Sequence, residues 1–242
     1  MSPRSRIMRD RGVITTTPAR ASSRRSSYSI DVILFTPRGK QLASLCVRAD
    51  DPRARERWML PHDEAVPGDS LDVAARRIAK AACGIEPAWL EQVGAFADDR
   101  RHPTDVPLSI AYVGVVPATE IEQGSEAHVW FGVSEPPTMA PRQRAMLDGA
   151  LEALRTRMDY APIAFRLLPP MFTLSELQQM YELLLGKRLH KASFRRALQA
   201  AFLVEPTDEW RSEGRGRPAQ FFRFAPRKRR GGRRGVRFDL LA

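Results

Sequence analysis

Residues 60–85 read LPHDEAVPGDSLDVAARRIAKAACGI, and their spacing predicts a loop followed by one amphipathic helix. Apolar residues recur three and four positions apart between Leu71 and Ala82. Ser70 stands where a helix N-cap is expected, and Gly84 stands where such a helix ends. A divalent cation would need several oxygen ligands on one face of this helix, three or four residues apart. The residues at those positions are Ile78, Ala81 and Ala82.

The order of residues in this segment resembles the Nudix box, the motif of a pyrophosphate-hydrolysing site. Asp69 takes the place of the first glutamate of that motif, and Arg77 takes the place of its arginine. Gly84 and Ile85 match its ending, whereas Asp63 replaces its opening glycine. The three helix glutamates are replaced by the apolar residues named above. The resemblance therefore implies a nucleotide-binding frame with no catalytic residue and no metal site, and the alternative is an ordinary core helix.

Length and composition favour two domains in a reducing compartment. A chain of 242 residues can bury two modest cores. Its two cysteines, Cys46 and Cys83, lie in apolar surroundings typical of buried thiols rather than of a disulfide framework. Residues 1–27 lack the apolar run of a secretory signal, and no stretch approaches membrane-spanning length. We expect a cytoplasmic bacterial protein that makes no membrane contact, with an organelle transit peptide as the alternative reading of the start.

Charge is shared unevenly along the chain. Residues 1–28 carry a net charge of about +6, residues 29–160 about −5, and residues 161–242 about +10. An acidic middle between two basic ends is typical of a protein in which one part binds a polyanion and another does not. Residues 1–27 show no periodicity and are predicted to form a disordered basic arm.

Residues 28–160 are predicted to form an α/β/α sandwich of the Nudix type. Alternating and apolar runs separated by turn residues predict several strands, and one longer run has helical spacing. The expected strands are 29–36, 41–47, 90–96, 108–116 and 128–133, and the expected second helix is 140–159. The turn at 37–39 predicts a hairpin between the first two strands.

Paired prolines within residues 161–171 predict a linker, after which a second domain covers 172–225. Thr173 and Glu176 have the spacing of a capping box, and Gly186 is placed to end the helix that follows. A second short helix is expected from Lys191 to Phe202. Two short helices in tandem indicate a helix-turn-helix.

The segment after these helices predicts a wing, in which 203–204 and 221–224 pair around a basic tip. The second helix would enter the major groove of duplex DNA while the tip lies along the phosphate backbone. The expected DNA contacts are Lys187, Arg188, Lys191, Ser193, Arg195, Arg196, Arg215 and Arg217. A basic tail, 226–242, is predicted to add DNA affinity that does not depend on sequence. The alternatives are a solvated basic helix and an RNA-binding module.

Residues 28–225 resemble the NrtR-type Nudix-related transcriptional regulators of bacteria. FTLSELQQMYELLLGKRLHKASFRR, at 172–196, is similar to the segment around their paired DNA-binding helices, and GRPAQFFRF, at 216–224, to their wing. LEQVGAFADDRRHPTDVPLSIAYVGVV, at 90–116, is similar to a strand, loop and strand of their Nudix domain. In that loop only Arg101 and Pro103 are in register with the family.

The resemblance implies a dimeric repressor of genes for NAD synthesis that ADP-ribose or another adenine nucleotide releases from its operator. The predicted effector contacts are arginines for the phosphates and aromatic rings for the base. They are Arg57, Arg77 and Arg101, with Trp58 and Phe96 as the rings. The alternative is an active Nudix pyrophosphohydrolase with a nucleic-acid-binding appendage, with metal ligands drawn from other acids. Those acids are Asp69, Asp72, Asp98 and Asp99.

Overall fold

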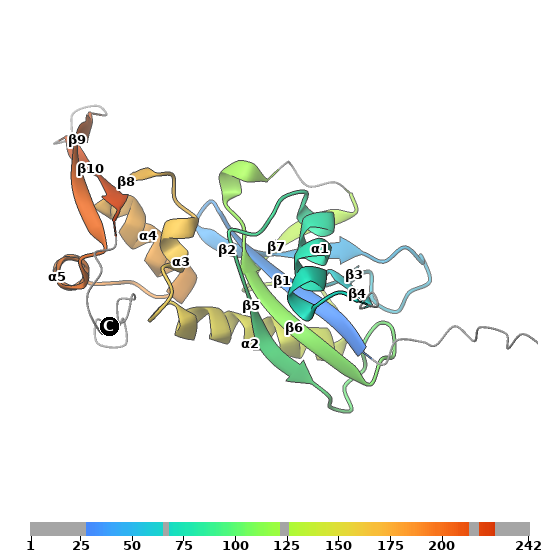
Figure 1. Cartoon of the computed structure of the whole chain (residues 1–242). Coiled ribbons are helices and arrows are strands. Elements are labelled where there is room, and N and C mark those ends of the chain that lie inside the picture. The colour runs from blue at the N-terminus through green and yellow to red at the C-terminus, as the bar shows by residue number, and fades with distance from the viewer. Residues whose placement is uncertain (1–27, 65–67, 122–125, 213–217, 226–242) are drawn as a thin grey trace, which may run out of the picture.

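The computed structural model of the chain describes residues 28–64, 68–121, 126–212 and 218–225. A large sheet with a helix on each face forms one part of the molecule, and a smaller group of helices and strands projects from one end (Figure 1). None of the helices in these ranges is both long enough and apolar enough to cross a membrane. Both cysteines are free thiols, Cys46 buried and Cys83 partly buried, as predicted.

The sheet has seven strands in a mixed arrangement. The order along it is β3-β2-β1-β6-β5, with β4 paired to β1 and β7 paired to β2. Only β1 and β6 are parallel neighbours, and β1 with β2 forms the predicted hairpin. The strands are β1 (Tyr28–Arg38), β2 (Gln41–Arg48), β3 (Trp58–Met59), β4 (His62–Glu64), β5 (Trp89–Phe96), β6 (Leu108–Val115) and β7 (His128–Gly132). A 3-10 turn, η1 (Ala118–Glu120), precedes β7.

Two helices, α1 (Leu71–Cys83) and α2 (Pro141–Arg157), cover opposite faces of the sheet. Successive side chains of a strand point to opposite faces, so β1 contributes to two cores. Val32 and its even-numbered neighbours pack with α1, whereas Ile33 and Phe35 pack with α2. The α/β/α sandwich predicted from the sequence is therefore confirmed.

The caps of α1 lie where the sequence predicts them. The Ser70 hydroxyl accepts a hydrogen bond from the backbone N–H of Val73 at 3.3 Å. Gly84 ends the helix at φ +83°, a left-handed conformation that glycine adopts without steric strain. Ala74, Ala75, Ile78 and Ala79 form its buried face.

The smaller part is a three-stranded sheet packed against short helices. Its elements are α3 (Ile163–Arg166), β8 (Met171–Thr173), α4 (Leu174–Leu185), α5 (Lys191–Ala201), β9 (Val204–Arg211) and β10 (Ala219–Phe224). The strand order is β8-β10-β9, and Val204 pairs with Phe224 as expected for the wing. The segment expected to be a linker contains α3 and the first residue of β8. Proline spacing did not indicate either element, because a single helical turn and a three-residue strand leave no periodicity to read.

The capping box of α4 also ties this helix to the wing. Glu176 accepts hydrogen bonds from the backbone N–H of Thr173 at 2.7 Å and from Arg211 of β9 at 2.6 Å. Burial opposes ionisation of Glu176, but these donors outweigh it and hold the pKa of its carboxyl below the usual value. One carboxylate thus satisfies a helix terminus and an ion pair between two elements.

Replacing Glu176 with glutamine keeps an oxygen that can cap α4 but removes the ion pair with Arg211, so the free energy of unfolding is expected to fall by about 1 kcal/mol. Urea denaturation of the full chain measures this change. Glu152→Gln, an exposed substitution on α2, is the matched control and should stay within about 0.5 kcal/mol of the wild type. Equal values for the two variants would contradict a stabilising role for the Glu176 contacts.

One apolar core runs from the α2 face of the sheet into the winged part. Leu154 and Met158 of α2 belong to the same buried cluster as Phe172, Leu177 and Leu198. Phe165 of α3 lies at the centre of this junction. Its ring centroid is 4.5 Å from that of Phe224, 5.7 Å from that of Phe172 and 6.2 Å from that of Tyr181. Tyr181 in turn contacts Phe194 of α5 at 5.5 Å.

Candidate DNA interface and effector site

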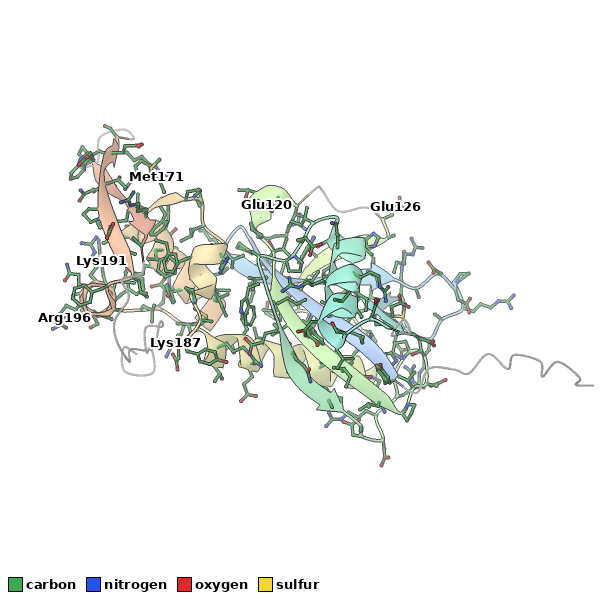
Figure 2. All side chains as sticks on the ribbon, viewed as in Figure 1. Glu120, Glu126, Met171, Lys187, Lys191 and Arg196 are labelled. Atoms are coloured by element: carbon green, nitrogen blue, oxygen red, sulfur yellow. The ribbon has the colours of Figure 1, made fainter. Side chains whose placement is uncertain are left out.

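The exposed face of α5 is basic and carries no acid. Lys191, Arg195 and Arg196 are exposed, whereas Phe194 and Leu198 anchor the opposite face of the helix in the core. Lys191 and Arg196 project at the end of the molecule that lies farthest from the large sheet (Figure 2). A rigid helix with cations on one side and an anchored apolar side is the geometry with which a recognition helix enters a major groove.

The remaining predicted DNA contacts lie in the first turn of α5, in the turn before it, or outside the described residues. Lys187 and Arg188 are exposed in the turn between α4 and α5. The Arg188 guanidinium is 3.3 Å from Glu182, which is a weak pairing because Arg188 is 95% exposed. The Ser193 hydroxyl lies 3.3 Å from the His190 ring in the first turn of α5. Arg215 and Arg217 lie outside the residues that the structure describes.

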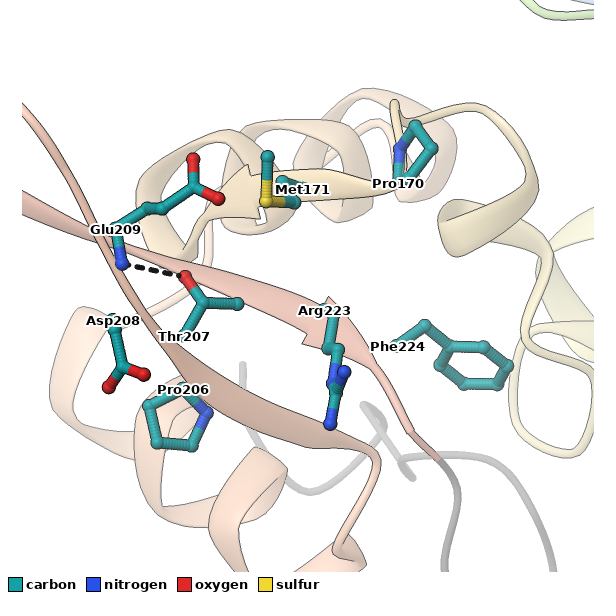
Figure 3. A pocket seen from close by; sticks show the side chains of 8 residues that line it. All are labelled: Pro170, Met171, Pro206, Thr207, Asp208, Glu209, Arg223 and Phe224. Atoms are coloured by element: carbon teal, nitrogen blue, oxygen red, sulfur yellow. Dashed lines mark hydrogen bonds between the residues drawn. The ribbon is translucent and has the colours of Figure 1, made fainter.

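A hollow on the wing sheet is unsuited to phosphate. It has a volume of about 690 Å³ and is lined by residues of β8, β9 and β10 (Figure 3). Asp208 and Glu209 contribute acids to its wall, and Arg223, which also lines it, is 3.3 Å from Glu205. Like charges would repel a nucleic acid backbone from this face, so α5 remains the candidate DNA surface.

Arg77, the arginine of the Nudix-like segment, is held at the surface between two acids. Its Nη1 donates to Asp63 at 2.7 Å, and its Nε lies 3.7 Å from Asp69. The side chain is 39% exposed, so solvent partly screens these ion pairs.

Arg101 is also paired with an acidic side chain. It pairs with Glu56 of the loop before β3, whose side chain is only 10% exposed. In the same region Arg57 lies above the Trp58 ring, 6.0 Å from its centroid, and Trp58 packs edge-to-face on Phe131 at 5.1 Å. Sequence reasoning did not identify Glu56 as the partner of Arg101. The structure thus places Arg101 beside the loop before β3, next to Arg57 and to Trp58, the first residue of that strand.

Phe96 and Arg77 are separated by the sheet. Phe96, at the end of β5, packs with the core on the α2 face, and α1, which carries Arg77, covers the other face. The two side chains can contact one ligand only if that ligand reaches around the sheet edge. A cavity of about 860 Å³ between the β1–β2 turn, α2 and α4 contains none of the five predicted effector contacts.

The acids around α1 do not converge on a cation site. Asp69 faces Arg77, and Asp72 accepts a hydrogen bond from the Tyr112 hydroxyl at 2.7 Å. The inward helix position that a metal-binding glutamate would take is Ile78, which is buried in the α1 core. Among the described residues no three acidic, histidine or cysteine side chains are grouped for a metal. The residues present do not fit a magnesium site of the Nudix kind.

A buried polar cluster that was not predicted joins β1, the loop 97–107 and α2. Asp31 of β1 is fully buried, and its Oδ1 is 2.9 Å from His102 Nε2 and 2.9 Å from Gln143 Nε2. The Ser29 hydroxyl donates to its other oxygen at 2.6 Å. Burial raises the pKa of the Asp31 carboxyl, but the hydrogen bond and charge of His102, with help from His62 and Ser29, lower it below the ordinary value. The signal for this cluster was a single acid within an otherwise apolar strand.

Known proteins similar to this chain contain both of its parts in one chain. Residues 164–224 match the model of the NrtR DNA-binding winged helix domain, a range that starts in α3. A crystal structure of NrtR from Shewanella oneidensis in complex with a 27mer DNA has a TM-score of 0.72 and 26% sequence identity, covering 83% of this chain and 94% of that one. The chain has the architecture of the NrtR-type regulators. The resemblance and the fold class predicted from the sequence are both confirmed.

Two further relatives agree with this NrtR-type architecture. The ADPR responsive transcriptional repressor NtrR of Acinetobacter baylyi is 29% identical over 204 residues, which cover 81% of each chain. A crystal structure of a MutT/nudix family protein from Enterococcus faecalis has a TM-score of 0.64 at 16% identity, covering 84% of this chain and 89% of that one, and shows the fold alone. The individual effector and DNA contacts, and the domain boundaries, stay predictions.

Proposed function

We propose that the protein is a DNA-binding transcriptional repressor whose sheet domain senses ADP-ribose or a related adenine nucleotide without hydrolysing it. The observation that carries the proposal is the acid-free, basic face of α5 within a winged helix that matches the NrtR domain. The Acinetobacter baylyi relative is an ADPR responsive transcriptional repressor, which supports both the repressor function and the effector. Genes of NAD metabolism are the proposed targets, the cytoplasm the proposed location and a homodimer the proposed assembly.

Each proposed DNA contact has a distinct role. Arg195 and Arg196 lie where a recognition helix meets base edges, and guanidinium groups suit the paired acceptors of guanine. Lys187 and Lys191 are placed to contact phosphates, which fixes the register of the protein without reading sequence. Arg215 and Arg217 of the wing tip and the tail 226–242 are proposed to add backbone contacts. Several such cations predict an affinity that falls steeply with salt, because bound counterions are released.

The effector is proposed to act through the core that both parts share. A nucleotide held by Arg77 and Arg101, with Arg57, Trp58 and Phe96 as the further proposed contacts, would favour one arrangement of α2 and the winged helix. The DNA half-sites would favour another arrangement. Such coupling is reciprocal, so DNA must weaken nucleotide binding by the same factor by which the nucleotide weakens DNA binding.

Catalysis is not part of the proposal. Hydrolysis of a pyrophosphate in a Nudix site depends on a metal that activates water and neutralises the phosphates. Ile78, Ala81 and Ala82 supply no oxygen ligand for it, and Asp69 and Asp72 are engaged by other side chains. Incubation with ADP-ribose and magnesium should therefore release no AMP above background. Turnover would instead favour the alternative function, a pyrophosphohydrolase.

Binding of the full chain to a duplex from its own upstream region should be preferred over binding to a scrambled duplex of equal length. ADP-ribose is expected to weaken the specific complex by about 5- to 150-fold, the usual range of allosteric coupling. Fluorescence anisotropy at one fixed salt concentration measures both effects. Adenosine, which lacks phosphates, is the matched ligand control and should leave the affinity unchanged. Equal affinity for the two duplexes would contradict the repressor assignment, and indifference to adenine nucleotides would contradict the sensor assignment.

A further inference from the structure

Hydrogen bonds from α2 hold the loop 97–107, which carries Arg101. The backbone N–H of Arg142 donates to the Arg101 carbonyl at 3.2 Å. The buried Arg142 guanidinium donates to the carbonyls of Val106 and Asp98, each at 2.6 Å. Both ends of the loop and its middle are therefore fixed to one helix. This leaves Arg101 little freedom in its backbone position.

His102 fastens the same loop to the sheet. Its Nε2 lies 2.9 Å from Asp31 and its Nδ1 lies 2.8 Å from the Thr104 hydroxyl, so both ring nitrogens have a polar partner. The side chain of His102 is fully buried, so water cannot replace these partners. A buried polar group that loses its partner is strongly destabilised, which makes the position of His102 well defined.

Contacts around Arg77 also lead to Asp31. Gln143 donates to Asp31 and accepts from the backbone N–H of Leu60 at 3.1 Å, and thereby holds the segment that leads into β4. His62, in β4, meets the His102 ring edge-to-face with centroids 5.1 Å apart. The next residue, Asp63, is the partner of Arg77. Arg77 and Arg101 are thus each connected by a short chain of contacts to Asp31.

We propose that Asp31, His102 and Gln143 form a buried positioning cluster that sets the spacing of Arg77 and Arg101 for the two phosphates of a nucleoside diphosphate ligand. This inference rests on the proposed sensor function and adds the residues that tune it. Two cations held at a fixed spacing bind a pyrophosphate group more tightly than two mobile ones, because less freedom is lost on binding. Buried partners behind the contacting residues supply that fixed geometry.

Replacing His102 with leucine in the full chain should weaken ADP-ribose binding, measured by isothermal titration calorimetry, by tenfold or more. The affinity for duplex DNA without nucleotide should stay within twofold. Thr36→Val is the matched control, since the buried Thr36 hydroxyl donates to Val116 at 2.8 Å at the other end of β1. It loses one buried hydrogen bond without touching either loop and should leave ADP-ribose affinity unchanged. Thermal melts establish that each variant is folded at the assay temperature.

A double-mutant cycle separates positioning from general destabilisation. If His102 acts through Arg101, His102→Leu causes no further loss of ADP-ribose affinity in an Arg101→Ala background, whereas a merely structural role gives additive losses. His102→Gln, which retains a donor for Asp31, provides a second, milder variant and should recover part of the affinity. Wild-type affinity in His102→Leu, or additive losses in the cycle, would overturn the cluster and leave the sensor function standing. A wild-type chain that does not bind ADP-ribose would overturn both.

Discussion

Replacing Arg195 or Arg196 of α5 with alanine is expected to weaken binding to the operator duplex by about 1–3 kcal/mol if the arginine reads a base. That range corresponds to about 5- to 150-fold in affinity. Both side chains are exposed on a helix whose other face is anchored by Phe194 and Leu198, so truncation removes the contact without disturbing the core. The loss should be accompanied by relaxed preference among base substitutions at one operator position.

Arg76→Ala supplies the matched control for this experiment. Arg76 is exposed on α1, so the substitution removes the same charge from a helix on the large sheet, remote from α5. Its effect on operator affinity should stay within about twofold at equal salt. A uniform loss across operator and scrambled duplexes would assign the arginine to phosphates instead of bases. Wild-type affinity in both arginine variants would contradict the assignment of α5 as the recognition helix.

The helices were the most predictable part of the fold, because their signals are local. Ser70 and Gly84 cap the two ends of α1, and Thr173 forms the capping box of α4 with Glu176, as the spacing indicated. The strand β8 and the turn α3 were missed, since each is stabilised by distant partners. Phe172 of β8 pairs with Phe222, and Phe165 of α3 packs on Phe224, so each partner lies fifty or more residues away along the chain.

The candidate effector site was less predictable than the DNA surface. A recognition helix presents its cations to solvent, and helical spacing shows which residues share that face. The environment of Arg101 depends instead on Glu56 and on Arg142, which only the folded chain brings beside it. The sequence shows Asp31 as an acid in an apolar strand. It does not show the partners of Asp31, because His102 and Gln143 are 71 and 112 residues away along the chain.

Phe165→Ala is expected to lower the free energy of unfolding by about 3–5 kcal/mol, the typical effect of truncating a buried aromatic ring. The ring is 8% exposed and contacts Phe172, Tyr181 and Phe224, so its removal leaves a cavity where the two parts of the core meet. Urea denaturation followed by tryptophan fluorescence measures the change. Tyr160→Ala, an aromatic residue that is 46% exposed just before α3, should stay within about 0.5 kcal/mol.

The same substitution tests whether the shared core carries the effector response. Because one apolar cluster spans both parts, the wild-type chain should unfold in a single cooperative transition. With the ring of Phe165 absent, the winged helix is held to α2 by fewer contacts, and the ratio of DNA affinities without and with ADP-ribose should move toward one. Phe165→Leu, which keeps most of the volume, should lose less than about 1.5 kcal/mol and keep most of the coupling. Two separate transitions in the wild type, or full coupling in Phe165→Ala, would place the communication between sheet and wing outside this core.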